Sequence, residues 1–385
     1  MIEDWRHGGF GLYLHWPFCA AKCPYCDFNS HVATAIDQKR WLSAYLSELD
    51  RYAAQTEGRI LNTVFFGGGT PSLMDPEIVA AIIERIRRNW QTSNDFEITL
   101  EANPTSVESG RFRAFSKAGV NRVSMGMQAL NDEDLRRLGR MHSVAEGQKA
   151  FDIARKQFDR VSFDLIYARQ HQSIEDWKSE LDEALRMAVD HLSLYQLTIE
   201  PGTVFGARHD AGKLRGIPED DISAEMYFAT QEICEKHGLP AYEISNHARP
   251  GAESRHNLIY WRYGDYIGIG PGAHGRLTEN GVRHATDTLK QPGAWLAQVE
   301  KTGAGENERA ALPREEQAIE YLLFALRLSE GLEMERFNMI SRSPLDEATM
   351  RHLEDIGMIE RKNGFLRATD QGRPVLNAII RDLIP

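Results

Sequence analysis

Short runs of β-branched and aromatic residues alternate with longer amphipathic stretches over the first two thirds of the chain. Runs of this kind that are bounded by turn-forming residues are typical of β-strands. Six such runs occur before residue 245. They span residues 10–16, 60–66, 96–101, 120–127, 160–167 and 191–199.

Between these runs lie stretches whose apolar residues recur at helical spacing. In the first stretch, Trp41, Tyr45 and Leu49 lie four residues apart and share one face of a helix. Strands and helices in this alternation favour a parallel sheet with right-handed crossovers. Six units are too few for a complete eight-unit barrel, so we expect an α/β fold with a partial (β/α)6 TIM-like barrel. The predicted helices span residues 37–55, 76–90, 106–118, 143–157 and 173–189.

The alternation stops after Pro250. A segment rich in Gly and aromatic residues follows at 256–275, and a loop at 303–308 leads into the tail of the chain. We therefore predict three parts. These are a partial barrel at 1–245, a connecting segment at 246–306 and a C-terminal domain at 307–385.

The tail has the pattern of a small α+β domain. Helices are predicted at 315–329 and 345–356, and the pair Asn363-Gly364 is a strong signal for a hairpin turn. Helices followed by a hairpin resemble a winged helix, so we expect a winged-helix-like domain. Residues 309–385 carry 11 basic and 13 acidic side chains, which disfavours DNA binding and favours a packing role.

Composition limits the partners and the location of the protein. The chain has 385 residues, of which 45 are basic and 56 acidic, giving a formal net charge of -11. This net negative charge repels nucleic acid, and we expect no nucleic-acid partner. Its longest apolar runs hold about six residues, whereas a bilayer crossing needs about 20. The first residues lack the basic and apolar regions of a secretory signal, so a cytoplasmic protein is expected.

Three of the four cysteines lie within eight residues. Cys19, Cys23 and Cys26 follow the first predicted strand, while Cys234 stands alone. Clustering of this kind in a reducing compartment favours a metal site over disulfides. Three thiolates can hold three irons of a 4Fe-4S cluster and leave the fourth iron open for a small molecule. The alternatives are three unligated thiols, or a zinc site completed by His15 or His31.

The spacing CxxxCxΦC, with Tyr25 before the last cysteine, resembles the signature of the radical S-adenosylmethionine (radical SAM) superfamily. This resemblance implies that Cys19, Cys23 and Cys26 bind the cluster and that the open iron chelates SAM. It also implies that Tyr25 lies beside the adenine of SAM. A six-unit partial barrel agrees with the same superfamily.

A glycine-rich turn follows the second predicted strand. Residues 67–71 read Gly-Gly-Gly-Thr-Pro, and glycines allow a backbone to approach a ligand closely. By itself such a turn is more often only a turn. Behind the cysteine motif it resembles the glycine motif of the superfamily, which implies that Gly68, Gly69 and Thr70 hold the methionine end of SAM.

Polar side chains end the third, fourth and fifth predicted strands, where such folds keep ligand contacts. Individually each could be a helix cap. Together with Arg140 they resemble HemN, the oxygen-independent coproporphyrinogen dehydrogenase group. That resemblance implies SAM contacts, with Arg140 as a bidentate clamp on the SAM carboxylate. The implied contacts beyond those of the glycine turn are Tyr13, Glu101, Gln128, Arg140, Asp164 and Ile166.

The sequence also departs from HemN. Phe28 stands where HemN has a further Cys, and only 18 residues precede Cys19, where HemN has a longer extension over its active site. The segment 167–171 lacks the Gly-Leu-Pro that is usual in the family, which puts the contacts of that loop in doubt. These differences disfavour HemN activity.

Residues 256–261 read His-Asn-Leu-Ile-Tyr-Trp and resemble the HNxxYW motif of heme chaperones related to HemN. A histidine beside two large aromatic rings could bind heme iron axially while the rings cover the macrocycle. For a lone motif, a satisfied histidine among packing aromatics is the usual alternative. We predict His256 as the heme ligand, with His274 as the chief competitor.

The resemblance therefore implies a heme chaperone that binds a 4Fe-4S cluster, SAM and heme and delivers heme to acceptor hemoproteins such as respiratory cytochromes. The alternative is an enzyme that decarboxylates coproporphyrinogen III oxidatively through a 5′-deoxyadenosyl radical. A cluster-bearing nucleic-acid modifier is disfavoured by the charge. A homodimer and a transient membrane association are left open.

Overall fold

The computed structural model describes residues 3–33, 35–104, 109–341 and 343–384. Within these ranges the six predicted strands are present, and each pairs in parallel with the next along the chain. The α/β fold is thus confirmed. The strands are β1 (Phe10–Trp16), β4 (Ile60–Gly68), β5 (Gln91–Ala102), β6 (Arg122–Gln128), β7 (Arg160–Tyr167) and β8 (His191–Gln196).

The same sheet extends beyond these six strands at both ends. A further strand, β10 (Asp265–Ile269), pairs in parallel with β1, although the sequence pattern predicted no strand in this Gly-rich segment. The remaining strands pair antiparallel. They are β9 (Asn246–Ala248), β11 (His274–Glu279), β12 (Val282–Thr288) and β13 (Glu306–Ala311).

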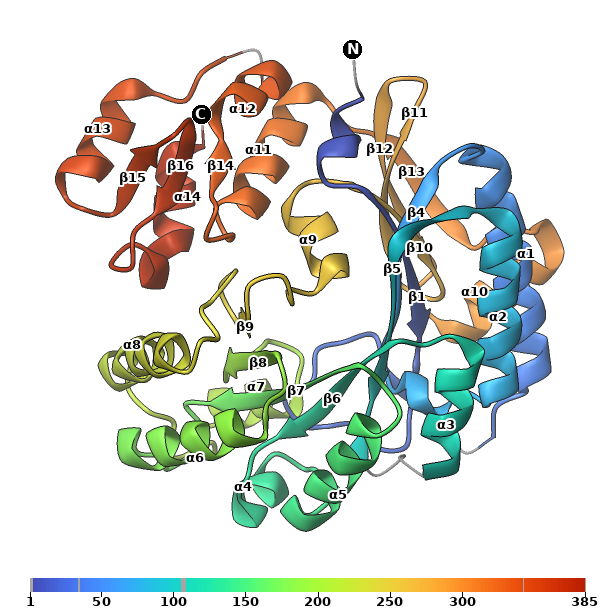
Figure 1. The fold of residues 1–385 in the computed structure, drawn as a ribbon, viewed down its shortest axis with the longest axis horizontal. Helices are drawn as coiled ribbons and strands as arrows, with labels where there is room; N and C mark the ends of the chain where they lie inside the picture. The colour runs from blue at the N-terminus through green and yellow to red at the C-terminus, as the bar shows by residue number, and fades with distance from the viewer. Residues whose placement is uncertain (1–2, 34, 105–108, 342, 385) are drawn as a thin grey trace.

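The sheet has the order β13-β12-β11-β10-β1-β4-β5-β6-β7-β8-β9. Its end strands are β13 and β9, and no pairing between them occurs among the described residues, so the sheet curves without closing (Figure 1). The strand β1 lies between β4 and β10 and is buried along nearly its whole length. Burial on both faces explains its near-continuous apolar sequence.

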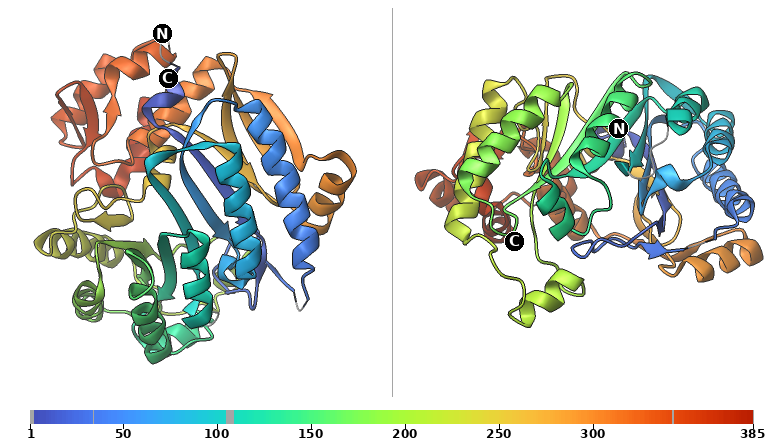
Figure 2. Two further views of the ribbon diagram at one scale, coloured as in Figure 1. Left: turned by 45° about the vertical axis from the view of Figure 1, so that its right-hand side comes forward. Right: turned by 90° about the horizontal axis from the view of Figure 1, so that it is seen from below.

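Helices cover the convex side of the sheet (Figures 1 and 2). The five predicted helices are present, although residues 106–108 of the third lie outside the described residues. Short or weakly periodic helices were not predicted. The helices of this part are α1 (Gln38–Gln55), α2 (Pro76–Asn89), α3 (Ser109–Ala118), α4 (Asp132–Arg137), α5 (Val144–Arg155), α6 (Ile174–Met187), α7 (Val204–Asp210), α8 (Asp220–Lys236) and α10 (Pro292–Thr302).

The periodic apolar residues bury their side chains as their spacing predicts. Trp41, Tyr45 and Leu49 of α1 are buried, and the ring of Trp41 stacks on Trp295 of α10 with centroids 5.4 Å apart. In α6, Trp177 and Leu181 are fully buried. These contacts fix the helices to the sheet and so hold the carboxyl ends of the strands in place.

The helix α9 (Arg255–Trp261) lies on the other, concave side of the sheet (Figure 1). It contacts β1, β4 and β10. The HNxxYW motif therefore faces the interior of the partial barrel and not an outer surface.

The C-terminal residues form a separate three-stranded sheet in the order β14-β16-β15. The element order, which runs helix, strand, two helices and hairpin, is that of a winged helix. Asn363 and Gly364 form the hairpin turn with φ of 54° and 83°, as their sequence predicted. The elements are α11 (Arg314–Ala325), β14 (Leu332–Glu333), α12 (Met334–Ser341), α13 (Glu347–Asp355), β15 (Ile359–Lys362), β16 (Phe365–Ala368) and α14 (Leu376–Leu383).

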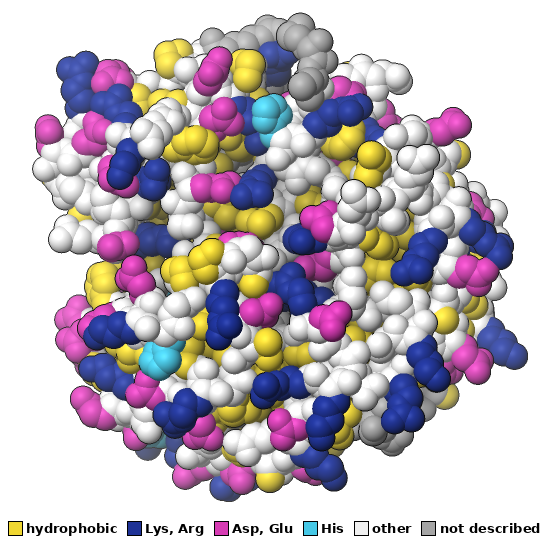
Figure 3. All heavy atoms as spheres, in the orientation of Figure 1, with side chains coloured by type: hydrophobic (Ala, Val, Ile, Leu, Met, Phe, Trp, Pro, Cys, Tyr) yellow, Lys and Arg dark blue, Asp and Glu magenta, His cyan; other side chains and the backbone are white. Residues whose placement is uncertain are grey.

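This C-terminal part has its own apolar core, to which Tyr263 contributes from the turn between α9 and β10. Basic and acidic side chains are interspersed over the face that Figure 3 shows. None of the helices in the described ranges combines the length and apolarity that a bilayer crossing requires. The three-part division of the chain stays a prediction.

Candidate functional site

The cysteine-bearing loop begins where β1 ends. Two short strands, β2 (Phe18–Cys19) and β3 (His31–Val32), pair in parallel and close the loop at its base. The ring of Phe18 packs edge-on against Trp41, and the hydroxyl of Tyr45 donates a hydrogen bond of 2.6 Å to the carbonyl of His15. Helix α1 thus holds both the strand and the start of the loop.

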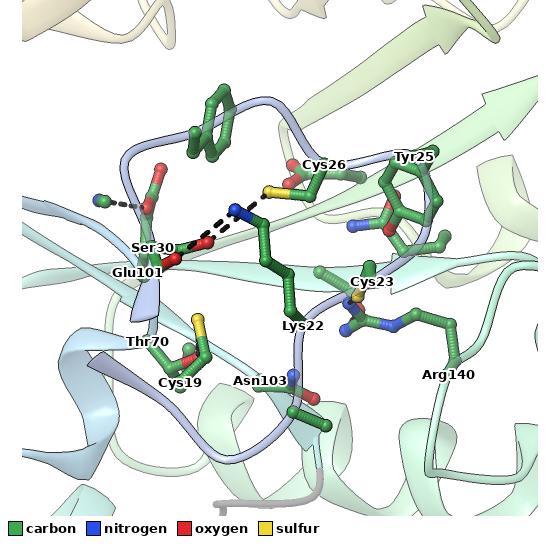
Figure 4. Close-up of a pocket in the computed structure, with 18 of the residues that line it drawn as sticks. Cys19, Lys22, Cys23, Tyr25, Cys26, Ser30, Thr70, Glu101, Asn103 and Arg140 are labelled. Atoms are coloured by element: carbon green, nitrogen blue, oxygen red, sulfur yellow. Dashed lines mark hydrogen bonds between the residues drawn. The ribbon is translucent and has the colours of Figure 1, made fainter. Parts of the chain in front are cut away.

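The three thiols of the loop face one cavity (Figure 4). Cys19 accepts a contact of 3.6 Å from the hydroxyl of Thr70, and Cys26 lies 3.9 Å from the hydroxyl of Ser30. Figure 4 shows the thiols around the side chain of Lys22, whose ammonium donates to the carbonyl of Ser30 at 3.3 Å. Burial raises the pKa of the Cys19 and Cys26 thiols.

The donor set of the loop suits an iron–sulfur cluster, because three soft sulfur ligands meet in a partly buried cavity. Within the described ranges, no three His, Cys, Asp or Glu side chains are grouped to hold a single metal ion. The ring nitrogens of His15 are both in hydrogen bonds, Nδ1 with the hydroxyl of Tyr13 and Nε2 with the carbonyl of Asn29, each at 2.9 Å. Cys234 is buried in α8, away from this loop.

The glycine turn runs against the backbone of the cysteine loop. The amides of Gly69 and Thr70 donate to the carbonyls of Trp16 and Phe18 at 2.7 and 2.9 Å. A Cβ atom on Gly69 would lie 2.6 Å from the Phe18 carbonyl oxygen, and Gly68 has a φ of 111°. Only glycine fits so close an approach with this backbone.

Two carboxylates line the same cavity, Glu101 near the end of β5 and Asp164 within β7. Glu101 accepts a hydrogen bond of 3.1 Å from the amide of Gly68, and Asp164 accepts one of 3.3 Å from Ser124. Burial, reinforced by Asp164, raises the pKa of Glu101 to about 8. Burial also raises the pKa of Asp164 to about 6. Both carboxyl groups would ionise more readily beside a positive charge, so the cavity favours a cationic partner.

Arg140 reaches the cavity from the loop after α4. Its Nη1 atom donates to the Sγ of Cys23 at 3.2 Å, and its Nη2 atom donates to the carbonyl of Gly126 at 2.8 Å. Its Nε atom is buried without a hydrogen-bond partner among the described residues. Gly139 has a φ of 69°, and a Cβ there would lie 2.6 Å from Pro24. The guanidinium is thus directed at the cysteine loop itself.

Most of the predicted SAM contacts gather around the cysteine cavity, and two do not. Tyr13 lines a neighbouring cavity, and Ile166 packs in a small apolar cluster. Gln128, which lines the cysteine cavity, has a φ of 70° at a break in the β6–β7 register, a conformation that non-glycine residues adopt mainly where surroundings enforce it. The predicted residues on the cavity are Tyr25, Gly68, Gly69, Thr70, Glu101, Gln128, Arg140 and Asp164.

Among the polar residues of this cavity that were not predicted, Lys22 and Ser30 lie beside the thiols. Both lie within or just after the cysteine motif, so their position beside the thiols was the available signal. The helix α7 was also missed as a support. The amide of Phe205 in α7 donates to the carbonyl of Pro24 at 2.9 Å, and its ring lies 6.3 Å from that of Tyr25.

A second cavity adjoins the first and shares Phe28, Gly68 and Glu101 with it. It has a volume of about 430 Å³ and opens to solvent. Rings from β1, α9, β10 and α11 form its walls. These aromatic residues, besides Phe28, are Tyr13, Tyr260, Trp261, Tyr266 and Phe324.

His256 does not line this aromatic cavity. It is fully buried between α9 and β4, where its Nδ1 atom lies 2.7 Å from the Thr63 hydroxyl and its Nε2 atom 2.6 Å from the Tyr260 hydroxyl. Its ring also stacks on Phe65. Both ring nitrogens of His256 are thus engaged in hydrogen bonds, and ligation of heme iron by His256 stays a prediction from the motif. His274, by contrast, is exposed on the cavity.

Comparison with known proteins agrees with this geometry. Residues 13–184 match the radical SAM superfamily, and residues 312–375 match the HemN C-terminal domain. The structure is similar to that of Escherichia coli HemN, described as a coproporphyrinogen III oxidase and radical SAM enzyme. The TM-score is 0.82 at 22% identity, and the match covers 98% of this chain and 90% of that one. At this identity the likeness shows the fold alone.

Relatives with higher identity cover nearly the whole chain. The heme chaperone HemW of Escherichia coli K12 is 34% identical over 379 residues, which are 96% of each chain. HemW of Mycobacterium tuberculosis H37Rv is 35% identical over 382 residues, or 97% of this chain and 95% of that one. A mitochondrial radical S-adenosyl methionine domain-containing protein 1 of Danio rerio is 39% identical over 335 residues, or 86% of this chain and 75% of that one.

The fold and the three-cysteine cavity define a radical SAM protein. Within that superfamily the chain belongs to the HemW family. Membership in the superfamily implies a 4Fe-4S cluster and SAM, and the family ties the protein to heme-related function.

Proposed function

We propose that the protein is a heme chaperone, which binds heme in the aromatic cavity and passes it to acceptor hemoproteins. The observation that carries this proposal is the position of that cavity directly beside the cysteine cavity. A largely apolar cavity of this size, with a few polar groups, is typical of a small-molecule site. The shared wall would let the state of one site influence the other.

The walls of the aromatic cavity suit a porphyrin. Rings of Tyr260, Tyr266 and Phe324 offer flat apolar surface to a flat macrocycle. The exposed ring of Phe28, at 59% of its surface, lies on the side shared with the cysteine cavity. Heme here is cargo, so an open and partly solvated cavity favours its release to an acceptor.

In the cysteine cavity, Cys19, Cys23 and Cys26 would each hold one iron of a 4Fe-4S cluster, whose fourth iron would bind the amino and carboxylate groups of SAM. The carboxylate of Glu101 favours a cationic group beside it, such as the SAM amino group or sulfonium. The glycine turn leaves room for the methionine end of SAM. Tyr25 would lie along the adenine.

The alternative function is oxidative decarboxylation of coproporphyrinogen III, as performed by the HemN enzyme of similar fold. The aromatic residue Phe28, at the position where HemN has a further cysteine, argues against it. Binding of heme without turnover is therefore expected.

The experiment is anaerobic reconstitution of the cluster in the full-length protein, followed by heme titration and an assay for coproporphyrinogen turnover. Heme binding, transfer to an apo-cytochrome and absence of decarboxylated product support the chaperone. Turnover without stable heme binding would select the enzyme. Cytoplasmic location and respiratory cytochromes as acceptors stay predictions, which cell fractionation and co-purification test.

A further inference from the structure

Two histidines, His15 and His274, line the aromatic cavity, and His256 lies buried near it; the three differ in the hydrogen bonds of their rings. His15 and His256 each have both nitrogens bound to a hydroxyl or a carbonyl group within 2.9 Å. His274 lines the cavity, and its ring has no hydrogen bond to any residue in the described part of the chain. Among these three, only the imidazole of His274 presents free nitrogens to a ligand.

The backbone that carries His274 is held firmly although its side chain is free. His274 opens β11, directly after a turn that the cysteine loop contacts, where the side-chain Nδ2 atom of Asn29 donates to the carbonyl of Pro271 at 2.9 Å. The preceding amide, of Ala273, donates to the Thr288 hydroxyl at 2.9 Å. A rigid backbone with a free ring at a cavity wall is the arrangement that a metal ligand requires.

We propose that His274 is the axial ligand of heme iron in the aromatic cavity. This inference rests on the proposed function and names the group that recognises the iron. A neutral imidazole is a common axial ligand of heme. His256 then supports the cavity indirectly, because it positions the hydroxyl and ring of Tyr260 on the cavity wall.

The charges around His274 are compatible with this role. Partial burial lowers the pKa of His274, as do Arg276 and Lys290, whereas Asp287 opposes them. The lowered pKa of His274 favours the neutral imidazole, which is the form that binds iron. Arg276 is already paired with Glu320 at 2.6 Å, whereas Lys290 is exposed and has no ion pair among the described residues.

The test compares His274→Ala with the wild-type protein and with His352→Ala, a matched variant at an exposed histidine of α13. Each full-length protein is titrated with ferric heme, and its absorption spectrum and iron–sulfur content are recorded. We expect His274→Ala alone to lose the spectrum of histidine-bound iron and to bind heme at least about tenfold more weakly. Added imidazole should restore the spectrum, since it replaces the missing ligand.

An iron-free porphyrin separates ligation from general cavity damage. It has no metal to bind, so His274→Ala should bind it as tightly as the wild type does. Equal loss of heme and of iron-free porphyrin would overturn the assignment and indicate a structural role. An unchanged heme spectrum in His274→Ala would also overturn it, and loss of that spectrum in Tyr260→Phe would then assign the iron to Tyr260. If the wild-type protein binds no heme, it is the proposed function that fails.

Discussion

The guanidinium of Arg140 lies 3.2 Å from the Sγ atom of Cys23, so a cation from the loop after α4 contacts one of the three thiols. The resemblance to HemN had implied only a clamp on the SAM carboxylate. Contact with a thiol adds a second effect, because hydrogen bonds to cysteine sulfur tune the potential of an iron–sulfur cluster.

Replacement of Arg140 by Met should therefore change both SAM binding and the cluster. We expect SAM to bind about ten- to 150-fold more weakly, as loss of a charge-assisted hydrogen bond costs about 1.5 to 3 kcal/mol. The reduction potential should become more negative, because a positive charge beside a sulfur ligand is lost. A redox titration followed by electron paramagnetic resonance measures the potential. An unchanged potential would mean that the contact with Cys23 does not persist once the cluster is bound.

Each of the three clustered cysteines should be necessary for the cluster. Replacement of Cys19, Cys23 or Cys26 by Ser should abolish a stable 4Fe-4S cluster, because a hydroxyl is a poor ligand for iron in this setting. Cys234→Ala is the control and should keep full iron and sulfide content, since this residue is buried in α8. Iron and sulfide analysis after anaerobic reconstitution gives the answer. An intact cluster in the Cys23→Ser protein contradicts the ligand assignment.

The buried carboxylate of Glu101 should make the cluster-free and SAM-free protein less stable as the pH rises. Burial and Asp164 raise the pKa of Glu101 from 4.5 to about 8 in the folded state. Between these two pH values the folded state holds a proton that the unfolded chain has released. The free energy of unfolding therefore falls with rising pH across this window, by on the order of 5 kcal/mol in total.

Glu101→Gln cannot ionise and should lack this part of the pH dependence. Urea unfolding of both proteins at several pH values from 5 to 9 measures the difference. The variant should be the more stable protein at pH 9 and should gain little at pH 5. Parallel pH profiles for the two proteins would show that Glu101 titrates normally.

His256 should matter for stability and not for iron ligation. His256→Ala removes hydrogen bonds to Thr63 and Tyr260 and leaves a cavity beside Phe65, so we expect a loss of about 2 to 5 kcal/mol in the free energy of unfolding. Protein that remains folded should still show the spectrum of histidine-bound heme. Unfolding curves and heme spectra recorded on one preparation separate the two effects, and an unaltered stability with a lost spectrum would restore His256 as the ligand.

Local patterns in the sequence predicted the parts of the protein that depend on short-range physics. Alternation of apolar runs predicted β1 and the other five strands of the partial barrel, because burial of a strand or a helix face imposes a fixed period. The spacing of Cys19, Cys23 and Cys26 predicted a shared cavity, since eight residues cannot separate far in space. Strand-end residues such as Glu101 were also predicted, because parallel strands bring their carboxyl ends to one edge.

Contacts between distant segments were decided by the tertiary structure alone. Strand β10 pairs with β1, and the spacing of apolar residues within either segment does not predict this pairing. Phe324 reaches the aromatic cavity from the C-terminal part of the chain. The surroundings of His256 include Thr63, which lies 193 positions away in the sequence. The hydroxyl of Thr63 forms a hydrogen bond with the ring of His256. A motif shows which side chains are close to one another along the chain. Whether the ring nitrogens of a histidine are free to bind a ligand depends on all the groups that folding places around the ring.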